Sequence, residues 1–87
     1  MPYISLNPAS GEVMKSFPDW NSSQLGDSLE MAGAAQARWR STSLDQRAAM
    51  LRQTAAELRR GMDEYARLIT LEMGKPIREA RGEVEKC

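Results

Sequence analysis

The 87-residue sequence contains no histidine, a single cysteine (Cys87) and no long apolar run. Without histidine, neither a serine–histidine nor a cysteine–histidine dyad can form, and a zinc site has too few of its usual ligands. One cysteine excludes an internal disulfide. No segment approaches the roughly 18 apolar residues that span a bilayer. These absences exclude much of hydrolase chemistry and a membrane-spanning helix.

The sequence also lacks net charge, because twelve Lys and Arg residues balance twelve Asp and Glu residues. A neutral chain offers no electrostatic basis for binding nucleic acid or an anionic membrane. The first residues do not form the basic stretch followed by an apolar segment that marks a secretory signal. We therefore expect a cytoplasmic protein with no nucleic-acid partner and no membrane partner.

Residues 3–17 predict a β-hairpin. Strand-forming residues occupy 3–6 and 12–17, and Asn7-Pro8-Ala9-Ser10-Gly11 joins them. Pro8 fixes its own φ and Gly11 can supply a positive φ, as a tight connection requires. An isolated hairpin is marginally stable in water, so this one is expected to pack on another element.

Residues 23–87 predict four helices. The first covers about 23–40, the second follows a capping box at Ser43–Gln46 and ends or bends at Gly61, the third covers 62–73, and the fourth begins at Pro76. Apolar residues recur at helical spacing in each, as in Leu44, Ala48, Leu51, Ala55 and Leu58. The fold class is therefore α+β, a hairpin followed by about four helices.

The last apolar stripe runs through Ile77, Ala80 and Val84 to Cys87 without a C-terminal capping signal. We therefore expect the natural chain to continue beyond Cys87. A thiolate is disfavoured late in a helix, so Cys87 is expected to be buried in a core rather than reactive. No catalytic role is assigned to Cys87.

Other chemical interpretations compete with structural ones. Glu79 and Glu83 could share a metal or a proton, but two carboxylates on a solvated helix face are favoured. Aromatic side chains at Trp20, Trp39 and Tyr65 are expected to anchor packing rather than to bind a ligand. Four methionines fit core filling better than an adaptable partner surface (Met31, Met50, Met62 and Met73). No glycine belongs to a GxGxxG or GxxxxGK[ST] loop, so no phosphate site is predicted.

Three segments together resemble the N-terminal part of the NAD(P)-dependent aldehyde dehydrogenase superfamily. They are "NPASGEV", "AAQARWRSTSLDQRAAMLRQTAAELR" and "ARLITLEMGKPIREARGEVEKC". The resemblance runs from about residue 4 to residue 87. The block Leu71–Pro76, followed by Glu79-Ala80 and Glu83-Val84, looks most like the succinate-semialdehyde dehydrogenase branch.

The resemblance implies a function for the complete protein. In that family a cysteine attacks the aldehyde, hydride passes to NAD or NADP, and a glutamate activates water to hydrolyse the thioester. The segments of Gly-Gln-x-Cys and Glu-Leu-Gly-Gly type that carry these residues do not occur here. The resemblance therefore assigns no catalytic, cofactor-binding or metal-binding residue to this chain, and the chain alone is expected to be inactive.

The resemblance also implies a place in a larger fold. Residues 1–87 would be an incomplete N-terminal part of an α/β Rossmann-like cofactor-binding domain, with 3–17 as its hairpin and 23–87 as its helical segment. The complete enzyme would oxidise a small aldehyde, succinate semialdehyde or a similar one, and form homodimers or homotetramers. The alternative is a small non-enzymatic helical module that binds a protein partner through its apolar stripes.

Overall fold

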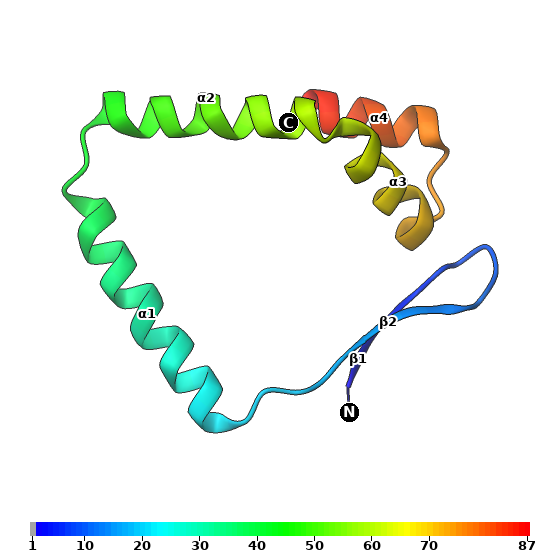
Figure 1. Ribbon diagram of the computed structural model, residues 1–87, viewed down its shortest axis with the longest axis horizontal. Helices are drawn as coiled ribbons and strands as arrows, with labels where there is room; N and C mark the ends of the chain where they lie inside the picture. Colours follow the sequence, from blue (N-terminus) through cyan, green and yellow to red (C-terminus); the bar gives the residue numbers. More distant parts are fainter. Residues whose placement is uncertain (1) are drawn as a thin grey trace.

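The computed structural model describes residues 2–87 as a two-stranded antiparallel sheet followed by four helices (Figure 1). The elements are β1 (Tyr3–Leu6), β2 (Val13–Phe17), α1 (Ser22–Arg40), α2 (Leu44–Arg60), α3 (Met62–Met73) and α4 (Ile77–Lys86). The expected α+β arrangement is confirmed, with element boundaries close to those predicted from the sequence.

The hairpin connection has the geometry that its residues predict. The Asn7 amide donates to the Glu12 carbonyl at 2.9 Å, and the Gly11 amide donates to the Asn7 carbonyl at 2.7 Å. Gly11 has φ +77°, the left-handed conformation that glycine adopts without a steric penalty. Ser5 pairs with Lys15 and Leu6 pairs with Val13, so the register shifts by one residue and forms a β-bulge.

The hairpin rests on α3, as its marginal stability requires. The Ser5 hydroxyl donates to the Glu72 carboxylate at 2.6 Å. Gly74 ends α3 with φ +73°, and a Cβ added there would lie 3.1 Å from the Pro8 ring. Gly74 therefore serves both as a left-handed helix cap and as the point where the hairpin loop approaches α3.

Capping boxes begin the first two helices. At α1 the Gln24 amide donates to the Asn21 side chain at 2.8 Å, and the Asn21 amide donates back to the Gln24 side chain at 2.9 Å. The same exchange joins Ser43 and Gln46 at α2, which confirms the capping box predicted there. Each box satisfies amide groups that the first helical turn leaves without partners.

Arg47 stabilises the corner between α1 and α2. Its guanidinium donates to the carbonyls of Trp39 at 3.0 Å and Arg40 at 3.3 Å, and to the Thr42 hydroxyl at 3.0 Å. The same group lies 5.4 Å from the centroid of the Trp39 ring, a cation–π distance. A positive group at the C-terminus of α1 also complements the helix dipole.

The core is small and lies where α3 and α4 meet the end of α2. Ala66 and Ala80 are fully buried and Val84 is nearly so, with four partly buried residues around them: Leu58, Met62, Tyr65 and Ile69. Gly61 permits the bend between α2 and α3, because an added Cβ would lie 2.7 Å from the Tyr65 ring. Burial of Tyr65 against the core agrees with its predicted packing role.

Several positions that were expected to be buried are exposed. Leu44 is 81% exposed and Leu51 is 71% exposed, so the stripe on α2 meets the core only near its end, at Leu58. Ile77 is exposed as well, whereas Ala80 and Val84 are buried as predicted. Of the four methionines, only Met62 packs on the core, and the expectation of core filling is wrong for the other three (Met31, Met50 and Met73). These side chains are helical and apolar, but no other part of residues 2–87 covers them.

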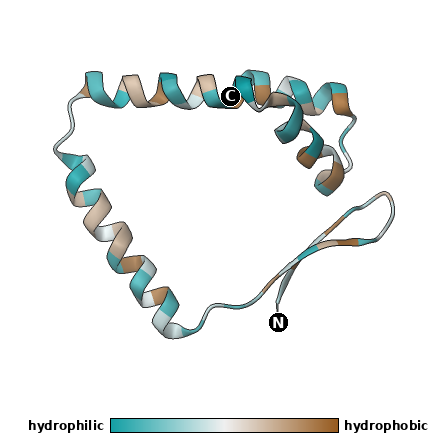
Figure 2. Ribbon diagram, in the orientation of Figure 1, coloured by the Kyte–Doolittle hydropathy of each residue, from teal (hydrophilic) through white to brown (hydrophobic). Residues whose placement is uncertain are grey.

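The described chain is an open, flat ring with extents of 46 × 35 × 14 Å. Its radius of gyration is 17.4 Å, whereas a compact chain of this length has about 12 Å. Within residues 2–87, no backbone of another helix or strand packs against α1. Hydrophobic residues nevertheless occur in every element, α1 included (Figure 2). The apolar pattern therefore exceeds what this chain buries by itself.

Candidate functional site

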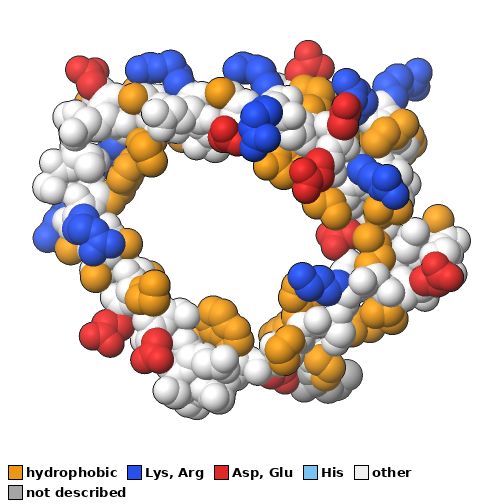
Figure 3. Space-filling view, viewed as in Figure 1, with side chains coloured by type: hydrophobic (Ala, Val, Ile, Leu, Met, Phe, Trp, Pro, Cys, Tyr) orange, Lys and Arg blue, Asp and Glu red, His pale blue; other side chains and the backbone are white. Residues whose placement is uncertain are grey.

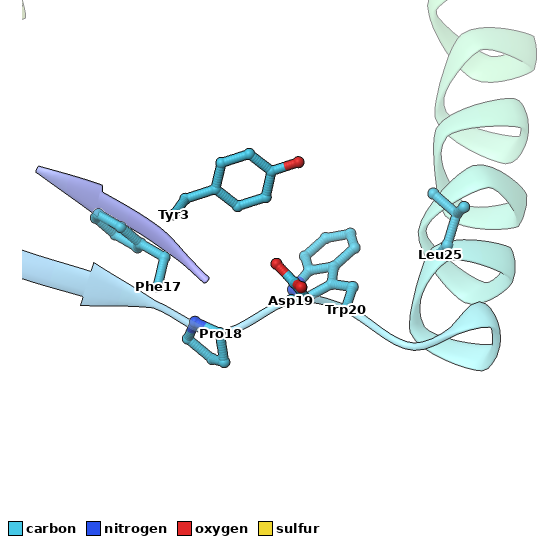
Figure 4. A pocket seen from close by; sticks show the side chains of 6 residues that line it. All are labelled: Tyr3, Phe17, Pro18, Asp19, Trp20 and Leu25. Atoms are coloured by element: carbon cyan, nitrogen blue, oxygen red, sulfur yellow. The ribbon is translucent and has the colours of Figure 1, made fainter. Parts of the chain in front are cut away.

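An open hollow of about 680 Å³ lies between the ends of the hairpin and the start of α1 (Figure 4). Its lining includes Tyr3 from β1, Phe17 from β2, Trp20 from the connection and Leu25 from α1, together with Pro18 and Asp19. The antiparallel register brings Tyr3 and Phe17 together, because they are directly paired across the strands. Pro18 then ends β2 and turns the chain toward α1.

The aromatic side chains of this hollow are mostly exposed. Trp20 is 61% exposed, so the expectation that it anchors packing is wrong within this chain. The Lys15 ammonium lies 5.1 Å from the centroid of the Phe17 ring and covers one of its faces. Large aromatic surfaces of this kind gain most from packing against apolar protein. The hollow therefore has the character of a docking surface.

A second, narrower groove of about 260 Å³ lies at the end of α4. Its walls are almost entirely apolar and come from α2, α3, α4 and the residue after α4: Leu58, Tyr65, Leu68, Ile69, Glu83, Val84 and Cys87. These residues continue outward from the buried core of Ala66, Ala80 and Val84. The groove is thus the uncovered side of the same small core.

Cys87 lines this groove but is exposed, which contradicts the expectation that it is buried. Its amide donates to the carbonyls of Glu83 at 3.3 Å and Val84 at 3.2 Å, so it lies at the C-terminal end of α4. The prediction that Cys87 continues the helix is wrong, because α4 ends at Lys86 and Cys87 is its C-cap residue. Burial fails because α3 covers Ala80 and Val84 only, and nothing among the described residues covers the next position.

We expect Cys87 to react with iodoacetamide in native buffer at a rate within about tenfold of the rate in denaturant, because its thiol is accessible. The measurement is the mass of the alkylated chain over time, with and without denaturant. A Cys87→Ser variant should take up no label. Labelling that requires denaturant would contradict the exposed position.

Charged side chains brace the outer surface of α3 and α4. Lys75, just before α4, binds Glu83 of α4, and Arg81 of α4 binds Asp63 of α3, so the middle of α4 is tied to α3 and to the connection that precedes it. The hydrogen bond from Lys75 to Glu83 raises the pKa of Lys75 above its ordinary value, and the charges of Glu83 and Glu79 add to this effect. Glu83 is therefore engaged in an ion pair, while Glu79 lies exposed on α4. Exposed pairs of this kind contribute little stability.

Within residues 2–87, no cluster of three or more His, Cys, Asp or Glu side chains is placed to hold a metal ion. No helix in the same range is both long enough and apolar enough to cross a membrane. What the arrangement offers is apolar surface on the hairpin, α1 and the α3–α4 groove, which is suited to packing against protein.

Comparison with known proteins identifies a family. The sequence model of the aldehyde dehydrogenase family matches residues 2–87. The succinate semialdehyde dehydrogenase Sad of Escherichia coli, named as using NAD(P)+, is 43% identical over 83 residues, which are 95% of this chain and 18% of that protein. The NADP+ succinate-semialdehyde dehydrogenase of Deinococcus radiodurans is 42% identical over 83 residues, 95% of this chain and 17% of that protein.

A third relative is named for a longer semialdehyde. The glutarate-semialdehyde dehydrogenase of Pseudomonas aeruginosa is 37% identical over 78 residues, which are 90% of this chain and 16% of that protein. The chain therefore spans less than a fifth of the length of these relatives. The resemblance to aldehyde dehydrogenases that the sequence motifs indicate is confirmed.

Proposed function

Because the chain belongs to the aldehyde dehydrogenase family, we propose that it is the N-terminal part of an enzyme that oxidises an aldehyde to a carboxylate with NAD(P)+ through a cysteine thioester. The observation that carries this proposal is the family match over residues 2–87. The three-residue core and the open ring agree with a segment that is stabilised by more protein than these residues contain.

The names of the relatives support a proposal for the substrate class. Two relatives at 42–43% identity are named for succinate semialdehyde, and one at 37% for glutarate semialdehyde. Both compounds carry an aldehyde at one end and a carboxylate at the other. We propose succinate semialdehyde as the substrate of the complete enzyme, with a cytoplasmic location and a homodimeric or homotetrameric assembly.

The catalytic and cofactor groups are proposed to lie outside these 87 residues. Cys87 ends α4 beside an apolar groove, and the chain supplies no histidine to activate it. The residues do not fit NAD(P): the first amides of α1 and α2 bind their own capping side chains, and no glycine-rich loop precedes a helix. We propose instead that the hairpin and helices form the opening layer of the cofactor-binding domain and that the isolated chain forms no NAD(P)H.

A chimera tests this proposal. In the Escherichia coli relative, the 83-residue segment that matches this chain is replaced by the 87 residues described here. We expect NADPH formation from succinate semialdehyde within about tenfold of the rate of the unmodified relative, a barrier change of about 1.4 kcal/mol or less. The assay is the initial rate of NADPH absorbance at saturating substrate.

A second chimera carrying a scrambled version of the 87 residues serves as the control and should be inactive. An insoluble or inactive first chimera would contradict the proposed function. If the chain were instead a small non-enzymatic module that binds a protein partner, the first chimera would be inactive, because such a module would not complete the fold of an aldehyde dehydrogenase.

A further inference from the structure

The angle between α1 and α2 leaves apolar surface of both helices uncovered. Figure 3 shows hydrophobic side chains along much of the inner rim of the open ring, α1 and α2 included, while Lys and Arg lie mainly along the outer rim. Leu25 and Leu29 of α1 and Leu51 of α2 are each more than half exposed. Helices joined by about two to five residues commonly fold back into an antiparallel pair, and the connection here is residues 41–43. Because folding back would bury part of this apolar surface, the open angle requires an opposing interaction.

The corner between the two helices contains a closed set of hydrogen bonds that can supply it. The Thr42 hydroxyl donates to the Trp39 carbonyl at 2.7 Å and accepts from Nε of Arg47 at 3.0 Å. Nη2 of Arg47 donates to the same Trp39 carbonyl at 3.0 Å and to the Arg40 carbonyl at 3.3 Å. These bonds join the last turn of α1 to the first turn of α2, and each polarises the next. We call Thr42, Arg47 and the Trp39 carbonyl the corner network.

The residues on either side of Thr42 are held as well. The Ser41 hydroxyl donates to the Arg38 carbonyl at 2.9 Å, and Ser43 exchanges hydrogen bonds with Gln46 in the capping box of α2. Every residue of the connection therefore has its side chain bonded to a helix end. A hinge motion at this corner would break several of these bonds together.

We propose that the corner network is a latch that holds α1 open, and that breaking it lets α1 fold back along α2. Within residues 2–87, no other helix or strand packs against α1, so no contact between elements sets its direction. The latch keeps α1 from burying its apolar side against its own neighbour. This proposal does not depend on the proposed function, because it concerns only the geometry of residues 38–47.

The chemistry of the corner network selects the substitutions that test it. The planar guanidinium of Arg47 presents Nε and Nη2 to different acceptors at once, whereas a lysine ammonium is a single point charge that cannot replace this arrangement. Thr42→Val removes the hydroxyl and keeps the shape of the side chain, while Thr42→Ser keeps the hydroxyl. Arg47→Lys and Thr42→Val should therefore open the latch, and Thr42→Ser should not. The matched control is Arg52→Lys, at an exposed arginine of the same helix.

Pulsed dipolar electron paramagnetic resonance on the 87-residue chain measures the angle. Spin labels at Asp27→Cys and Ala56→Cys lie about three helical turns from the corner on α1 and α2, and Cys87→Ser removes the natural thiol. Gly26→Ala and Gly33→Ala are present in every sample to keep α1 helical. An excess of unlabelled chain excludes distances between molecules, and far-ultraviolet circular dichroism checks that helical content is equal.

We expect one main distance in the parent, in Thr42→Ser and in Arg52→Lys. In Arg47→Lys and in Thr42→Val, at least about half of the molecules should move to a distance shorter by roughly 10 Å or more, since the axes of packed helices lie about 8–10 Å apart. Should one of these variants lose helical content, the other decides.

Three results would overturn the latch. The first is a parent whose main distance is already the short one. The second is an unchanged main distance in Arg47→Lys and Thr42→Val, or a distribution that only broadens, because that would show a loose hinge rather than a helix held back from its neighbour. The third is an equal shift in Arg52→Lys. None of these measurements uses enzyme activity, so the proposed function is tested separately by the chimera.

Discussion

Replacing Ala80 with aspartate is expected to detach α4 from α3 and abolish the protected core of the isolated chain. Ala80 and Ala66 are both fully buried where the two helices cross. An aspartate at that position either leaves a carboxylate buried without a partner, at a cost of several kcal/mol, or forces the helices apart. A core of three residues has too little stability to absorb that cost.

Hydrogen exchange measured by NMR checks this expectation residue by residue. Amides of α3 and α4 should lose their protection in the Ala80→Asp variant, whereas the Asn21 and Ser43 capping boxes should be unaffected because they are local. The matched control is Ala56→Asp, the same substitution at an exposed position of α2. Ala56→Asp should lower the stability of α2 only through helix propensity, by about 0.7 kcal/mol or less. Similar losses in both variants would contradict the assigned core.

Replacing Gly26 and Gly33 with alanine is expected to stabilise α1 by about 2 kcal/mol in the isolated chain, since each glycine costs about 1 kcal/mol in a helix. No heavy atom lies within 4 Å of a Cβ added at either position, and neither residue has a positive φ. Within residues 2–87, the 19-residue helix α1 lacks the tertiary packing that supplies most of the stability of protein helices, so its intrinsic helix propensity matters more than usual. The substitutions should therefore produce a large rise in helical content.

Far-ultraviolet circular dichroism measured against temperature reports this gain in helical content. The double variant should melt as broadly as the parent, because no helix or strand within residues 2–87 packs against α1. Gly74→Ala is the control, and it should lower stability instead of raising it, because Gly74 has φ +73° and lies against Pro8. It should loosen the hairpin from α3. No gain in helicity from the double variant would contradict the exposed, unsupported position of α1.

The shape of the melting curve also bears on the non-enzymatic alternative. A self-sufficient helical module would unfold in one cooperative transition. A chain whose longest helix packs on no other element is expected to unfold gradually, with α1 exchanging its amides long before α3 and α4.

Much of the local structure could be predicted from the sequence because its signals are short in range. The capping box at Ser43–Gln46, the positive φ of Gly11 and the helix end at Gly74 each depend on residues within a few positions. The docking of Ser5 on Glu72 and the Arg47 contacts at the α1–α2 corner could not be predicted in the same way. They depend on where whole elements lie in space.

Sequence reasoning failed to predict which apolar side chains are buried, and Cys87, Leu51 and Met73 show the reason. A periodic apolar stripe predicts which side of a helix prefers to be covered, but it carries no information on whether a covering surface exists. The sequence by itself determined the order of the elements, most of their ends, the family, and the absence of the Gly-Gln-x-Cys and Glu-Leu-Gly-Gly segments that the family carries. Only the tertiary structure decided that three hydrophobic residues are buried among residues 2–87 and that no other helix or strand of that range packs against α1, because burial depends on contacts between distant segments.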